Sequence, residues 1–132
     1  MGDLNDINFF NNWIVNAADR AIKHGTCYHS HCIPQHTFVY DDESNGMKQV
    51  VTHVLKMENL SEEFPALMKE YELPVILEHA NKTPSKGVKG SKFGVKDLSW
   101  DAVIKINEWA KRDFDLFGYE MLDPTKIMSR ED

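Results

Sequence analysis

The chain lacks several features that would assign a protein to a class at once. Only two of its 132 residues are cysteine, too few for a disulfide framework, which fits a reducing compartment without requiring one. The net charge of −6 argues against general nucleic-acid binding, because that needs a basic face. No apolar run approaches the roughly 20 residues of a membrane span, and the segment FFNNWIV has no basic start of the kind a signal peptide has.

The composition predicts a globular protein. Apolar residues make up 42% of the chain and aromatic residues 11%, enough for a packed core. The length fits one domain or a piece of one. We expect residues 1–121 to form the folded part and residues 122–132, which show no periodicity, to be a poorly ordered tail.

Residues 50–73 hold the clearest predicted unit. The β-branched and apolar residues at 50–57 predict a strand. Ser61 can then cap a helix over 61–72, whose apolar positions follow helical spacing. They are Phe64, Leu67, Met68 and Tyr71. Because a strand that leads into a helix is the basic unit of an α/β sheet protein, we expect an α/β fold that is rich in helix and has few strands.

The flanking segments predict two more helices. Apolar stripes at helical spacing indicate helices over residues 5–24 and 99–117, and the glycines at 25 and 118 can end them. Between the first helix and residue 50, residues 37–40 predict a short strand. Residues 41–46 predict a turn that separates two β-like runs, so these runs can be neighbours in a sheet.

Residues 26–40 carry the most metal-binding side chains. These are Cys27, His29, His31, Cys32 and His36, the ligand types that zinc prefers. Structural zinc sites usually need a second pair of ligands a dozen or more residues away, and the sequence has none. We therefore predict that these residues do not share a metal ion, with a small zinc-binding module kept as an alternative.

Residues 82–96 form a basic segment inside an acidic protein. Five lysines occur here without an acidic residue, and the glycines among them let the backbone approach a ligand closely. Lysine binds phosphate as a point charge, although the order of residues is not that of a Walker loop. A solvated connecting loop is the alternative. The candidate anion-binding residues are Lys86, Gly87, Lys89, Gly90, Ser91 and Lys92.

Five segments, in this order, resemble the C-terminal half of sulfotransferases of the carbohydrate and bacterial type. The resemblance covers about residues 9–121. Its segments are HCIPQ at 31–35, FVYD at 38–41, HVLKMENL at 53–60, HANK at 79–82 and DFDLFGY at 113–119.

The resemblance implies a partial three-layer α/β fold related to P-loop kinases. It also implies transfer of sulfonate from 3′-phosphoadenosine 5′-phosphosulfate (PAPS) to a hydroxyl or amine of a carbohydrate or small-molecule acceptor, without a metal. The family's nucleotide-closing loop corresponds to Lys86-Gly87 or Lys89-Gly90-Ser91. By resemblance, the compartment is the cytoplasm or the Golgi lumen.

The sequence also departs from the family. No strand with a Lys/Ser/Thr phosphosulfate loop precedes the first predicted helix, and Lys56 stands where the family has arginine. These features predict that the chain alone is inactive and leave its catalytic residues unassigned. An N-terminal half or a partner chain would then cover its incomplete sheet. The alternative is a non-catalytic interaction subunit derived from the same fold.

Overall fold

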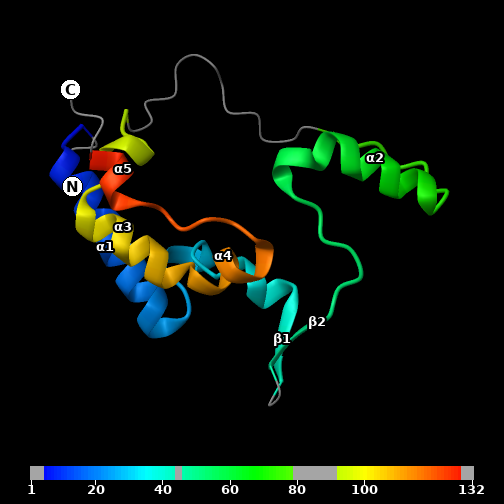
Figure 1. The fold of residues 1–132 in the computed structure, drawn as a ribbon, viewed down its shortest axis with the longest axis horizontal. Helices are drawn as coiled ribbons and strands as arrows, with labels where there is room; N and C mark the ends of the chain where they lie inside the picture. The colour runs from blue at the N-terminus through cyan, green and yellow to red at the C-terminus, as the bar shows by residue number, and fades with distance from the viewer. Residues whose placement is uncertain (1–4, 44–45, 79–91, 129–132) are drawn as a thin grey trace. The chain divides into compact units, whose positions relative to one another are not determined.

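The computed structural model describes residues 5–43, 46–78 and 92–128. The chain divides into two compact units: Met1–Phe38 with Lys89–Asp132, and Val39–Val88. Among the described residues, the structure is mixed α/β, with mostly helices and one two-stranded sheet (Figure 1). The prediction of a helix-rich α/β protein with few strands is confirmed at this level.

The first unit is built on two packed helices, α1 (Ile7–His24) and α3 (Trp100–Trp109) (Figure 1). Its other helices are α4 (Lys111–Phe117) and α5 (Pro124–Met128), with three short 3₁₀ helices, η1 (Tyr28–Ser30), η2 (Gln35–Phe38) and η4 (Val95–Asp97). The core is centred on buried Leu98, Ala102 and Val103. Packed around them are Phe10, Ile14, Val15, Ile106, Leu122 and Ile127.

Local signals in the sequence fix the ends of these helices. The Asp6 side chain accepts the N–H of Asn8 at 2.8 Å and caps α1, and Gly25 ends it with φ at 75°, a left-handed conformation that suits glycine. Ser99 caps α3 by accepting the N–H of Ala102 at 3.2 Å. The helix predicted over 5–24 is confirmed. The helix predicted over 99–117 is confirmed as two helices that meet at Ala110.

The second unit contains a hairpin and one longer helix. Strands β1 (Tyr40–Glu43) and β2 (Gly46–Gln49) pair antiparallel, with Tyr40 opposite Gln49. A 3₁₀ turn, η3 (Met57–Asn59), leads into α2 (Leu60–Glu70), which confirms the helix predicted over 61–72. These strands lie partly where a turn was predicted, at 41–46, so the two runs predicted on either side of that turn are not the strands that pair.

Two predicted strands are wrong. Residues 50–56 have no regular secondary structure, and residues 57–59 form η3. A strand needs a neighbouring strand for its backbone hydrogen bonds, and in the described part of the chain no strand pairs with 50–57. Of residues 37–40, Thr37 and Phe38 lie in η2 and only Tyr40 belongs to a strand. The N–H and hydroxyl of Thr37 both bond the Pro34 carbonyl, at 3.2 and 2.7 Å, which favours the 3₁₀ turn.

The predicted unstructured tail also needs correction. Residues 124–128 form α5. The Asp123 carboxylate accepts the N–H of Thr125 at 3.0 Å, which stabilises the start of this helix. Leu122 and Ile127 pack against the core. Sequence periodicity does not reveal α5, because five helical residues are too few to show an apolar period.

Candidate functional site

Asp113, in α4, joins two segments that are far apart in the sequence. Its carboxylate accepts the backbone N–H groups of Gln35 at 2.8 Å and His36 at 2.9 Å. The His36 ring Nδ1 lies 2.6 Å from Asp113 Oδ1. The two side chains are only 10% and 16% exposed, so the two contacts of His36 are partly shielded from water, whereas the N–H of Gln35 lies at an exposed site. One carboxylate therefore fixes η2 on α4.

The His36–Asp113 pair has a defined chemistry. A carboxylate only accepts hydrogen bonds, so we assign a proton to Nδ1 of His36. This leaves Nε2 as the ring nitrogen that can accept a proton, the arrangement in which a carboxylate orients a general base. The same contacts also serve as a structural anchor. Sequence reasoning considered His36 only as a zinc ligand and did not pair it with Asp113.

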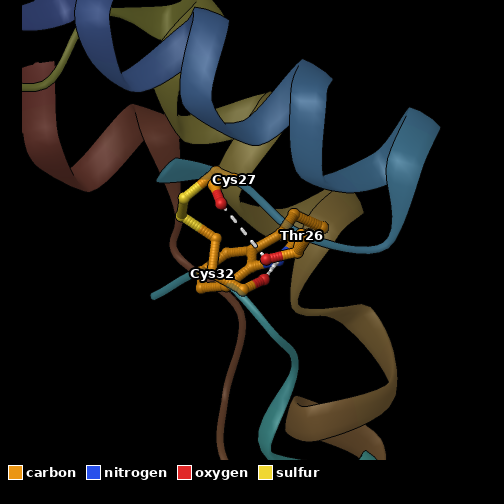
Figure 2. Close-up of a disulfide and its surroundings, with 4 residues drawn as sticks. Thr26, Cys27 and Cys32 are labelled. Atoms are coloured by element: carbon orange, nitrogen blue, oxygen red, sulfur yellow. Dashed lines mark hydrogen bonds between the residues drawn. A yellow bond between two sulfur atoms is a disulfide. The ribbon is translucent and has the colours of Figure 1, made fainter. Parts of the chain in front are cut away.

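Cys27 and Cys32 form a disulfide with their Cα atoms 5.1 Å apart (Figure 2). The Thr26 hydroxyl donates to the Cys27 carbonyl at 3.2 Å in this turn (Figure 2), and the indole N–H of Trp109 donates to the Cys32 carbonyl at 3.0 Å. Two cysteines are too few for a disulfide framework, as the sequence indicated. Whether they form one disulfide depends on how the backbone between them turns, which their separation in sequence does not reveal.

The predicted ligands whose side chains are described do not gather around one point. His31 is exposed, His36 bonds Asp113, and both sulfurs are in the disulfide; the His29 side chain lies outside the described ones. Within the described ranges, no group of three or more His, Cys, Asp or Glu side chains could hold a metal ion.

Most of the predicted anion-binding segment lies outside the described residues. This holds for Lys86, Gly87, Lys89, Gly90 and Ser91. Lys92 is described and exposed, with its Nζ 5.2 Å from the ring centroid of Phe93. The Phe93 ring in turn lies 5.4 Å from that of Phe10 in α1. The C-terminal end of the basic segment is therefore attached to the first unit.

Asn11 holds the same end of that segment. Its side-chain N–H₂ donates to the carbonyls of Ile7 at 3.1 Å and Asp97 at 3.0 Å. Its side-chain oxygen accepts the N–H of Ser99 at 2.6 Å. Asn11 is 9% exposed, and its side-chain amide donates two hydrogen bonds and accepts one. No sequence pattern predicts this role, because Asp97 and Ser99 are 86 and 88 positions away from Asn11.

Lys96 borders two cavities beside this anchor. One, of about 270 Å³, is also lined by Asn8, Asn11 and Ser99. The other, of about 350 Å³, is also lined by Lys126. The described end of the basic segment thus lies beside concave surface, but carboxylates line both cavities: Asp97 the first, and Glu120 and Asp123 the second. Asp123 also lies 3.7 Å from the Lys126 ammonium.

Two surface groups have shifted pKa values. Hydrogen bonds from Lys105 to Asp19 and Glu108 raise the pKa of its ammonium group. Hydrogen bonds from Thr125 lower the pKa of Asp123. Both shifts arise from contacts at the surface, away from Asp113.

Comparisons with known proteins give no relative. No family model matches the chain, and no match is found among curated proteins or solved structures. Among the described helices, none has both the length and the apolar character needed to cross a membrane.

Proposed function

We propose that this chain is the C-terminal part of a sulfotransferase-like domain. Such a domain has a three-layer α/β fold of the P-loop-kinase kind and transfers sulfonate from PAPS to a hydroxyl or amine acceptor. The proposal rests on the order of the family-like segments in the sequence.

The contact of Asp113 with residues 35–36 supports this proposal most directly. Asp113 begins the DFDLFGY segment, and Gln35 ends HCIPQ. One hydrogen bond, from the Gln35 N–H to the Asp113 carboxylate, joins the two segments across 78 positions. Two more bonds join Asp113 to His36, the residue that follows HCIPQ. Two segments selected only for their resemblance to one family therefore meet in space through a charge-assisted hydrogen bond, as expected if both belong to one site or its supporting shell.

Sulfonate transfer also needs groups that this sequence lacks. Cationic and backbone donors must stabilise the bridging and leaving oxygens, and a base must accept the proton of the acceptor. The sequence has no loop for the 5′-phosphosulfate. Activity then depends on an N-terminal half or partner chain that supplies this loop, while the Lys82–Lys96 segment contributes to holding the nucleotide.

The test is a titration of the full chain with adenosine 3′,5′-bisphosphate at low and moderate salt. We expect weak binding that weakens further as salt rises, because screening acts over roughly 8 Å near physiological ionic strength. Changing Lys86, Lys89 and Lys92 together to alanine should remove it. The proposal of a nucleotide-holding segment fails if the wild type does not bind at low salt.

A matched control removes the same charge elsewhere. Lys23, Lys69 and Lys111 are exposed and lie outside the basic segment. Their triple alanine variant should bind the nucleotide as the wild type does. Equal weakening by both triple variants would mean that only net charge matters, and the segment would then have no specific role.

A non-catalytic interaction subunit is the second candidate, and the second unit favours it. None of its described residues is buried, and Met57 and Ile76 are 80% and 84% exposed. Contiguous exposed apolar surface marks an interaction site, and one short segment holds the exposed apolar residues Leu73, Val75, Ile76 and Leu77. Association that survives high salt, measured by sedimentation of the chain without nucleotide, and its loss in a Met57→Ser, Ile76→Ser variant would support this role.

A further inference from the structure

The loop closed by the disulfide is docked on helices of the first unit. Within the loop, the Tyr28 ring stacks on Trp13 of α1, with ring centroids 6.1 Å apart and planes at 19°. The guanidinium carbon of Arg20 lies 5.6 Å from the same Tyr28 ring. The loop's last carbonyl, that of Cys32, accepts the indole N–H of Trp109 in α3.

The backbone of this loop adopts a conformation that needs a constraint. Ser30 has φ at 65°, in the left-handed region that residues with a Cβ rarely occupy. The turn is held by two backbone hydrogen bonds of 3.1 and 3.2 Å, from Ser30 to Cys27 and from His31 to Tyr28. The disulfide closes the same turn covalently.

The loop leads directly into the segment that binds Asp113. Only Ile33 and Pro34 separate Cys32 from Gln35 and His36. A change at the disulfide is therefore transmitted through two residues to the contacts that fix η2 on α4.

We propose that the Cys27–Cys32 disulfide is a redox-sensitive restraint. Its reduction releases residues 27–38 from α3 and α4, while the packing of α1 on α3 persists. This inference does not depend on the proposed function. Cys27 is buried and Cys32 is half-buried, so a thiol reductant is expected to attack at Cys32.

The reductant is a dithiol. Its thiolate attacks Cys32 Sγ, a mixed disulfide forms, and Cys27 leaves as a thiolate that takes up a proton. The second thiol of the reductant then attacks its own sulfur in the mixed disulfide and releases the Cys32 thiolate. Two electrons pass to the protein, which gains two thiols, and the dithiol becomes a cyclic disulfide.

The test measures amide exchange in the full chain with and without dithiothreitol, by two-dimensional NMR. Closing so short a loop is worth about 40-fold in the ordered population by chain entropy. We therefore expect exchange of the Gln35 and His36 amides to accelerate by about 10- to 50-fold on reduction. The Trp109 indole N–H signal should shift, and the amides of Ala18 and Val103 should change less than about twofold.

A Cys27→Ser, Cys32→Ser variant should show the released state with or without dithiothreitol, and reoxidation of the wild type should restore the bound state. Three results would overturn the proposal. In the first, Gln35 and His36 stay protected after reduction to two titratable thiols. In the second, the amides of Ala18 and Val103 lose protection to the same extent. In the third, the disulfide stays intact in excess dithiol.

Discussion

Replacing Asp113 by alanine tests the contact that joins α4 to η2. The change removes the acceptor for two backbone N–H groups and for the His36 ring. The two His36 donors are partly buried, and a buried donor that loses its partner costs about 1–3 kcal/mol. The exposed N–H of Gln35 adds less, and losses at one shared acceptor are not additive. We expect the free energy of unfolding of the first unit to fall by about 2–4 kcal/mol.

Tryptophan fluorescence during urea unfolding measures this change selectively. All three tryptophans, Trp13, Trp100 and Trp109, lie in the first unit, so their signal reports that unit. The slope against urea should stay constant, since the surface exposed on unfolding does not change much.

Asp115 provides the matched control, because it lies on the same helix and is exposed. Asp115→Ala should change the free energy of unfolding by less than about 0.5 kcal/mol. Asp113→Asn, which keeps one acceptor oxygen without the charge, should fall between the two. If Asp113→Ala and Asp115→Ala agree within about 0.5 kcal/mol, the contact does not stabilise the unit and the reasoning is refuted.

Three further predictions concern the first unit. Asn11→Ala should lower the free energy of unfolding by about 1–3 kcal/mol, because it leaves the partly buried Asp97 carbonyl and Ser99 N–H without their partner. Asn12→Ala, at an exposed site, should leave it unchanged. Thermal unfolding measures both variants. Val103→Ala should cost about 2 kcal/mol in urea, since Val103 is 1% exposed and its truncation leaves a cavity. Hydrogen bonds from Thr125 lower the folded pKa of Asp123. The stabilisation of α5 by the Asp123 carboxylate is therefore complete above the unfolded pKa and is lost as pH falls through the folded pKa. An NMR titration in which the Asp123 pKa is not below that of an unfolded aspartate would contradict this prediction.

The helices could be predicted because their signals are local. Capping by Ser99 and termination at Gly25 and Gly118 depend on neighbours within four residues. The apolar stripe of each helix indicates which of its faces packs against the core. The break at Ala110 carries no such signal in the sequence, since alanine is a good helix former.

The site could be predicted only in part, because its contacts join distant residues. His36 meets Asp113 across 77 positions, and Asn11 meets Ser99 across 88. The resemblance named segments that contain Gln35 and Asp113, but a single sequence does not pair them, and His36 was considered only as a metal ligand. Asn11 had no signal in the sequence, since two of its three hydrogen bonds, to Asp97 and Ser99, exist only when α1 packs beside residues 97–99.

The second unit shows why the helix prediction succeeded where the strand prediction failed. The helix α2 forms although none of its residues is buried, because a helix satisfies its backbone hydrogen bonds within the same segment. The hairpin forms because β1 and β2 are close in sequence and supply each other's partners. Residues 50–56 have the composition of a strand, but a strand also needs a second backbone, and in the described chain nothing supplies it. Composition therefore predicts what a segment can form, and the availability of a neighbour decides whether it forms.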